Sequence, residues 1–157
     1  MKVVILNDDN AEEIIEHFVS FGYDDFIVFQ KSGKLKKEQL DYFCLNDITV
    51  TVLKGFYREN TSSILSKIRG SLTKAFFLVY SAEICYVDLD RARALHNSHQ
   101  GIATLIQIEN SKKFISSAIF EQEVFDYISQ EKYFEKETLK ELCQDLELMI
   151  LNQRINE

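Results

Sequence analysis

The sequence has no proline, and its five glycines are scattered along 157 residues. Loops that hold phosphates through backbone N–H groups usually need clustered glycines, so no such loop is expected here. The three cysteines, Cys44, Cys85 and Cys143, are odd in number and widely spaced. This pattern predicts neither a zinc site nor a disulfide framework. We expect buried, reduced thiols.

Long hydrophobic runs and an excess of positive charge are also missing. The apolar run Val3–Leu6 is too short for a signal peptide or a membrane span, which predicts a cytoplasmic protein without membrane contact. The net charge is −7, and the lysine cluster at positions 31, 34, 36 and 37 is interpreted as a solvated helix end. Because there is no basic stripe, a nucleic-acid partner is not expected.

Short apolar runs alternate with amphipathic helical patterns along the whole chain. Strands are expected at residues 3–6, 26–29, 48–53, 76–80, 102–108, 114–120 and 148–151. Helices are expected at residues 12–21, 35–43, 64–72, 89–99, 123–128 and 137–145. This order, with an extra strand pair late in the chain, predicts an α/β three-layer sandwich with a mixed, mostly parallel sheet. We expect one domain spanning residues 1–157.

Local signals indicate where two of these helices begin. Asn10 is placed to cap the first long helix, with Glu13 in capping-box position. Asp88 is placed to cap the helix at 89–99, with Asp90 favoured in its first turn. Asp88 and Asp90 also match the Asp-x-Asp string of metal-dependent glycosyltransferases, but the helix cap is the preferred interpretation.

Two histidines lie on one face of the same helix. His96 and His99 are spaced i, i+3, so their side chains are neighbours. A zinc site would need a third ligand, and none is close in the sequence. We therefore expect a structural or surface role for both.

The candidate functional site follows the strand at 76–80. In open α/β sheets, ligands bind beyond the carboxyl ends of the strands. Ser81, Ala82 and Glu83 come directly after this strand, and the middle residue has no ligating group. Asn7 and Asp8 hold the equivalent place after the first strand.

The stretch from residue 74 to 104 resembles the sugar-1-phosphate nucleotidyltransferases, most closely the cytidylyltransferases that act on glucose-1-phosphate. That family has a strand ending in Tyr-Gly-Asp-Gly, a Val-x-Asp segment, and a helix ending in a Phe-His-x-x-His-Gly-like string. The corresponding segments here are Val79–Glu83, Val87–Asp90 and Leu95–Thr104. Residues 21–28, 118–128 and 134–139 add similarity in the same order along the chain.

The resemblance implies a Rossmann-like fold of the kind shared by glycosyltransferases of the GT-A type. It also implies a reaction that joins a nucleoside triphosphate to a sugar-1-phosphate and releases pyrophosphate. That chemistry needs backbone amides around the triphosphate, a basic group at the attacked phosphate, and a carboxylate that holds Mg²⁺.

The sequence departs from the family pattern at each of these requirements. The first strand runs through Asn7, Asp8 and Asp9 directly into a helix, without the family's glycine-rich loop and its lysine. The family's metal-binding aspartate falls on Ala82. The sugar-contacting segment after Ile108 is also shortened. Losing one phosphate-stabilising contact typically costs about 10²–10³ in rate.

These departures predict a non-catalytic, nucleotidyltransferase-like protein, with no catalytic residues and no cofactor. We expect a binding or assembly partner in nucleotide-sugar or polysaccharide synthesis, with a protein partner or a second copy of itself. Residual ligand binding, to a nucleotide or a sugar phosphate, is expected at Asn7, Asp8, Tyr80, Ser81 and Glu83.

Two alternatives remain open. The first is a minimal sugar-1-phosphate nucleotidyltransferase that holds Mg²⁺ at a site rebuilt from Asp8, Asp9 and Glu83. The second is a sensor of nucleotides or sugar phosphates in the crevice near Asn7 and Tyr80. The sequence does not choose between partners, ligands, oligomeric states or pathways.

Overall fold

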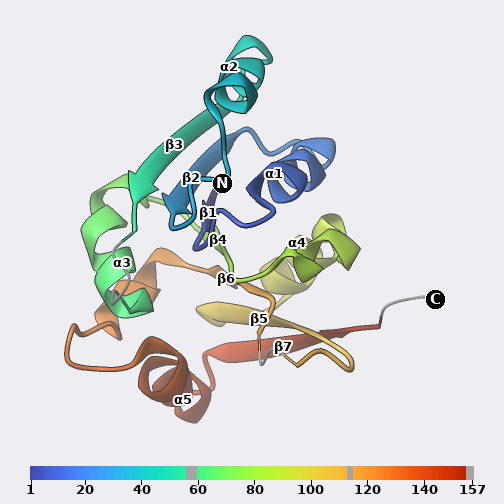
Figure 1. Ribbon diagram of the computed structural model, residues 1–157. Helices are drawn as coiled ribbons and strands as arrows, with labels where there is room; N and C mark the ends of the chain where they lie inside the picture. The colour runs from blue at the N-terminus through green and yellow to red at the C-terminus, as the bar shows by residue number, and fades with distance from the viewer. Residues whose placement is uncertain (56–59, 113–114, 155–157) are drawn as a thin grey trace.

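Seven strands form one mixed sheet in the order β3-β2-β1-β4-β6-β5-β7 (Figure 1). The computed structural model describes residues 1–55, 60–112 and 115–154. The strands are β1 (Lys2–Ile5), β2 (Asp25–Gln30), β3 (Thr49–Lys54), β4 (Phe76–Val79), β5 (Ala103–Ile108), β6 (Ser117–Phe120) and β7 (Leu148–Gln153). Strand β6 is antiparallel to both of its neighbours, and the other pairs are parallel. The predicted mixed, mostly parallel sheet is confirmed.

Helices cover both faces of this sheet (Figure 1). The α-helices are α1 (Ala11–Ser20), α2 (Lys37–Leu45), α3 (Thr61–Ile68), α4 (Leu89–Ser98) and α5 (Leu139–Gln144). Side chains of α1 and α4 belong to one buried cluster, and side chains of α3 and α5 belong to another. The sheet lies between the two clusters, so the predicted three-layer sandwich is confirmed. None of the helices in the described part of the chain is long and apolar enough to cross a membrane.

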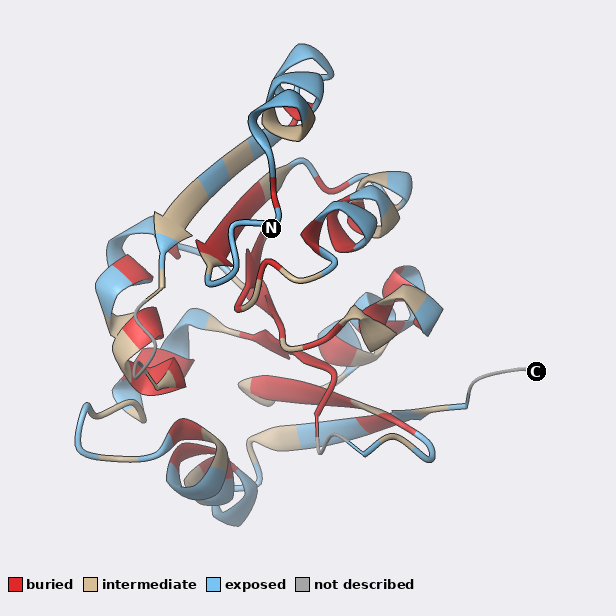
Figure 2. Cartoon of the chain, viewed as in Figure 1, coloured by how far each residue is buried: buried red, intermediate tan, exposed pale blue. Residues whose placement is uncertain are grey.

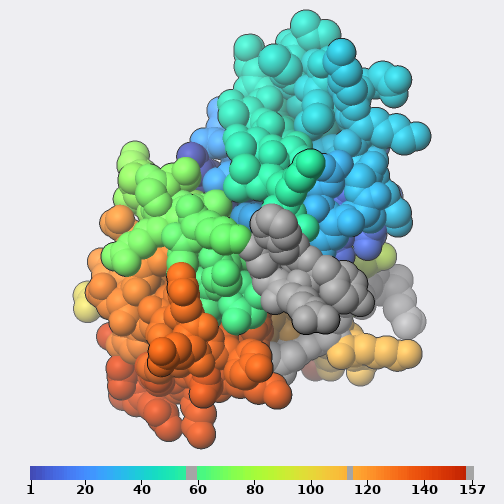
Figure 3. All heavy atoms as spheres, turned by 60° about the vertical axis from the view of Figure 1, so that its left-hand side comes forward, coloured from blue at the N-terminus to red at the C-terminus, as the bar shows by residue number. Residues whose placement is uncertain are grey.

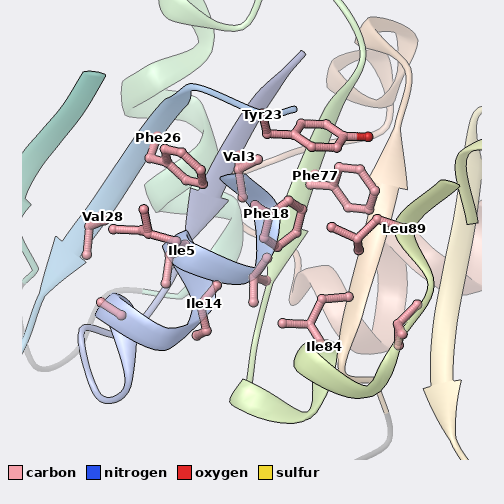
Figure 4. Close-up of a cluster of buried hydrophobic side chains, with 14 of the residues drawn as sticks. Val3, Ile5, Ile14, Phe18, Tyr23, Phe26, Val28, Phe77, Ile84 and Leu89 are labelled. Carbon is pink, nitrogen blue, oxygen red and sulfur yellow. The ribbon is translucent and has the colours of Figure 1, made fainter. Parts of the chain in front are cut away.

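Alternating apolar residues explain why the central strands carry a core on each face. In β1, Val3 and Ile5 face the α1 side, whereas Val4 faces the α3 side. Phe18 of α1 packs against the α1 side of the sheet. Its ring lies 5.1 Å, centroid to centroid, from that of Phe77 of β4 in an edge-on arrangement (Figure 4). The strands at the middle of the sheet are accordingly buried along their length, while the helices expose their outer faces (Figure 2).

Several local predictions are confirmed and others are corrected. Asp88 accepts hydrogen bonds from the backbone N–H groups of Asp90 and Arg91, as expected for a helix cap. Asn10 does not cap α1 with its side chain. Its backbone is in the left-handed region, at φ 60°, where the chain turns sharply into the helix.

The late helical segments are less regular than the sequence pattern predicts. The helix expected at 123–128 is a short 3₁₀ helix (Gln122–Asp126), and the one expected at 137–145 consists of a π-helical turn (Phe134–Thr138) followed by α5. The strand expected at 114–120 begins only at Ser117, because residues 115 and 116 are described but not in strand conformation, and residue 114 lies outside the described residues. All three cysteines are free, but Cys44 and Cys143 are exposed rather than buried.

His96 lies in α4, whereas His99, expected on the same helix, follows its end in extended backbone (φ −116°, ψ 159°), and both make hydrogen bonds that are consistent with a structural role. The backbone N–H of Gly101 donates to Nδ1 of His99 at 2.9 Å, so Nε2 carries the proton of the neutral ring and faces Thr104 Oγ1 at 2.7 Å. Thr104 Oγ1 also contacts Nδ1 of the buried His96 at 2.8 Å, and Nε2 of His96 contacts Glu121 Oε1 at 2.8 Å. This chain of bonds ties the end of α4 to β5 and β6.

Candidate functional site

The sheet reverses its direction of winding between β1 and β4. From β1 the chain crosses to β2 on one side, whereas β4 pairs with β1 on the other side. A crevice forms at such a point, beyond the carboxyl ends of the two strands. Here two small cavities, of about 150 and 270 Å³, meet the ends of β1 and β4, and both are lined by Asn7 and Tyr80.

The smaller cavity lies against the start of α1. Besides Asn7, its polar lining comes from Asp9, Asn10 and Ser81, and Ala82 adds a methyl group. Asn7 Oδ1 accepts a hydrogen bond from the backbone N–H of Asp9 at 3.0 Å, which fixes the side chain. Ser81 Oγ is turned back to accept from the next 3₁₀ helix (Ala82–Tyr86). These polar groups therefore serve the local turns as well as the cavity.

The larger cavity lies between β1, β4 and the start of α3. Its remaining polar lining comes from Lys31, Asn60, Thr61 and Glu135. Asn60 caps α3 by accepting from Ser63, and the segment of residues 122–138 lies beside α3 on this face (Figure 3). The contact between the two is specific because Ser62 Oγ donates to the carbonyl oxygen of Lys132 at 3.0 Å.

Glu135 is the best-positioned acidic group of this crevice. One of its oxygens, Oε1, accepts a hydrogen bond from Tyr80 Oη at 3.1 Å and a second one from Thr61 Oγ1. Burial, together with the charge of Glu135, raises the pKa of Tyr80 well above its usual 10. The phenol therefore stays protonated and donates to the carboxylate at neutral pH.

Asp8 is held away from the crevice by a neighbouring loop. Its side chain is buried, and its two oxygens accept hydrogen bonds from the backbone N–H groups of Lys31, Ser32 and Lys34 at 2.9–3.0 Å. The Ser32 hydroxyl adds a fourth bond, at 2.9 Å. Burial raises the pKa of Asp8, but these hydrogen bonds outweigh it and lower the pKa to about 2. Asp8 is thus a charged residue that anchors the loop after β2.

Asp9 and Glu83 each bind a different partner and do not face one another across the crevice. Asp9 pairs with Nζ of Lys34 at 3.0 Å, and this contact lowers the pKa of Asp9. Glu83 Oε1 accepts from the hydroxyl of Ser111, which belongs to the connection between β5 and β6, at 2.8 Å. Glu83 lines neither of the two cavities that contain Asn7.

The three carboxylates expected to form a rebuilt Mg²⁺ site, Asp8, Asp9 and Glu83, do not converge on one point. In phosphate-transferring sites Mg²⁺ is usually held by one or two carboxylates together with waters and phosphate oxygens. Ala82 offers no carboxylate, and the oxygens of Asp8 already accept four hydrogen bonds. Among the described residues, no three histidine, cysteine, aspartate or glutamate side chains come together as metal ligands.

Of the residues that the sequence indicated for ligand binding, the structure brings Asn7, Tyr80 and Ser81 together. It places Asp8 and Glu83 in structural contacts beside them. Sequence reasoning missed the part of the crevice that comes from distant segments, namely Lys31, Asn60, Thr61 and Glu135. No local motif marks these residues, and the sequence pattern around Lys31 indicates only a solvated lysine cluster.

The fold, but not the sequence, is similar to known proteins. No protein-family model matches the sequence, and no curated protein matches it. The 4-diphosphocytidyl-2C-methyl-D-erythritol synthase of Anaerococcus prevotii superimposes with a TM-score of 0.65 at 9% identity, over 97% of this chain and 86% of that one. A cytidylyltransferase from Leptospira borgpetersenii gives 0.60 at 9% identity, over 97% and 75%.

A third structure was determined with a bound nucleotide. CMP:2-keto-3-deoxy-manno-octonic acid synthetase, complexed with CTP, gives a TM-score of 0.58 at 7% identity, over 98% of this chain and 89% of that one. Identities this low establish the fold alone. The predicted resemblance to nucleotidyltransferases is therefore confirmed at the level of architecture.

Proposed function

We propose that this chain is a non-catalytic nucleotidyltransferase-like domain that binds a nucleotide in the crevice between β1 and β4. The observation that carries this proposal is the connection from β1 to α1. It has only five residues, Leu6–Asn10, and its Asp8 is committed to the loop after β2. A connection this short and this acidic leaves no cradle of backbone amides for a triphosphate and repels one electrostatically.

Three features support retained binding. The crevice lies at the position where ligands bind in open α/β sheets. Lys31 lines the larger cavity and supplies a positive charge for a phosphate group. At about 270 Å³, this cavity is close to the lower end of ligand pockets, near 300 Å³, which suits a nucleoside better than a whole triphosphate.

The choice of ligand follows from the structural neighbours. Two of them are a cytidylyltransferase and a CMP-sugar-acid synthetase complexed with CTP. By analogy of fold, we propose a role in nucleotide-sugar or polysaccharide synthesis, as a ligand-binding or assembly partner rather than as the transferase.

Calorimetry of the full chain tests this function. We expect CMP to release heat, Mg²⁺ to add nothing to its affinity, and CTP plus glucose-1-phosphate to yield no pyrophosphate. Lys31→Ala removes a cation that lines the larger cavity and should weaken CMP binding roughly 3–10-fold, the range for one exposed charge-assisted contact. Lys37→Ala, an exposed lysine at the start of α2, is the matched control. Metal-dependent release of pyrophosphate would refute the non-catalytic role, and absence of heat with every nucleotide would refute binding.

A further inference from the structure

Glu135 joins the crevice from a distant part of the chain and is fixed there by two hydroxyl groups. Tyr80 Oη and Thr61 Oγ1 both donate to the same carboxylate oxygen, Oε1. Tyr80 directly follows β4, and Thr61 is the first residue of α3. The carboxylate is therefore held in one orientation in the wall of the larger cavity.

The other oxygen of this carboxylate, Oε2, has no hydrogen-bond partner within the part of the chain that the structure describes. Among residues 1–55, 60–112 and 115–154, no donor contacts Oε2 of Glu135 and no lysine or arginine pairs with it. Oε2 is also not among the described side-chain atoms that are buried without a partner. Glu135 is partly exposed, and it is one of the residues that line the larger cavity. A carboxylate can accept about four hydrogen bonds, so its capacity is only half used.

A carboxylate oxygen at this place favours ligand groups that donate hydrogen bonds. A carboxylate in a wall of a site attracts N–H groups and repels carbonyl oxygens. Cytosine presents an exocyclic amino group, and guanine presents a ring N–H beside an amino group. Uracil and thymine present a single ring N–H between two carbonyl oxygens. Aspartate and glutamate accept from the amino group of cytosine in nucleic-acid recognition for the same reason.

Resting on the nucleotide binding proposed above, we infer that Glu135 determines base specificity in this crevice. It favours nucleotides whose base carries an amino group and rejects uridine and thymidine nucleotides. Tyr80 and Thr61 act as positioning residues because they hold the carboxylate in its orientation. Lys31, which lines the same cavity, offsets the negative charge of the ligand's phosphate.

The test compares nucleoside monophosphates by calorimetry on the full chain. We expect CMP or GMP to bind at least about tenfold more tightly than UMP, as one charge-assisted hydrogen bond provides. Glu135→Gln replaces the free oxygen by a group that can also donate, so this preference should fall to less than about threefold. Glu131→Gln removes the same charge from an exposed position in the same segment and should leave the preference intact.

A measurement on the ligand does not depend on how the variant folds. Inosine monophosphate lacks the amino group of GMP, and it should bind the unaltered chain more weakly than GMP does. Tyr80→Phe should reduce the preference for amino-bearing bases without abolishing binding.

Three results would overturn the inference. If CMP, GMP and UMP bind equally, nucleotide binding stands but Glu135 does not select the base. A preference that survives Glu135→Gln places the selection elsewhere. If no nucleotide binds at all, both the proposed function and this inference fail.

Discussion

Asp8→Asn removes the charge that holds the loop after β2 against the end of β1. In the native chain three backbone N–H groups and one hydroxyl donate to this buried carboxylate. A lowering of the pKa from 3.8 to about 2 corresponds to about 2 kcal/mol of folding free energy, at 1.36 kcal/mol per pKa unit. The amide also turns an N–H toward the N–H groups of the loop, so a total loss of about 2–4 kcal/mol is expected.

Urea unfolding followed by circular dichroism measures this loss. In thermal unfolding, for a chain of this size, we expect the melting temperature of the variant to be lower by roughly 5–15 °C. Asp9→Asn is the matched control, because Asp9 is a half-exposed neighbour whose partners are Lys34 and Ser32. It should have a clearly smaller effect, since exposed ion pairs contribute little.

The pH dependence provides a second check on the same reasoning. A carboxyl group whose pKa is lowered by folding stabilises the protein above its unfolded pKa, and that contribution disappears as the pH falls through its folded pKa. The difference in stability between the native chain and Asp8→Asn should therefore be complete above pH 3.8 and shrink toward pH 2. Equal stability of the two proteins near neutral pH, or a difference that does not change with acid, would refute the assignment.

Three further predictions concern the α4–β5 region. Gly101→Ala places a Cβ 2.8 Å from Nδ1 of His99 and 2.9 Å from the carbonyl oxygen of Glu147, so it should destabilise the protein by about 1–3 kcal/mol in thermal unfolding. As a control, the Cβ of Gly70→Ala meets nothing within 4 Å, so this variant should be neutral or slightly stabilising. Asp88→Ala removes the cap of α4 and should cost about 1 kcal/mol in chemical denaturation; an unchanged midpoint would contradict the cap. Burial lowers the pKa of His99 below its usual 6.5, so below this pH the unfolded chain binds more protons than the folded one and stability should decline. His99→Gln should flatten that part of the plot of stability against pH.

The sequence predicted most elements because the signals for them are local. The alternation of apolar residues in β1 and the capping of α4 by Asp88 depend on residues a few positions apart. The late segments were harder to predict because their form depends on packing. Residues 134–138 form a π-helical turn in which Phe134 is buried, and the helical pattern at 137–145 does not distinguish such a turn from a regular helix.

In the crevice, too, some residues could be predicted from the sequence and others could not. Asn7, Tyr80 and Ser81 follow strands, so the general rule for ligand sites in open sheets pointed to them from the sequence, and the structure places all three around one cavity. The rule also pointed to Asp8, whose role as an anchor depends on the loop 31–34, more than twenty residues away. Glu135 lies 55 residues from Tyr80 in the chain, and only the folded structure brings their side chains together.

By itself, the sequence determined the α/β class, the order of strands and helices along the chain, and the shortness of the connection after the first strand. The tertiary structure alone decided that β6 enters between β4 and β5, that Asp8 anchors a loop, and that Glu135 lies in the crevice. The physical reason is the distance along the chain over which each kind of interaction acts. Capping, turns and hydrophobic periodicity act over a few residues, whereas strand order and side-chain contacts between distant segments are set by how whole layers pack around a common core.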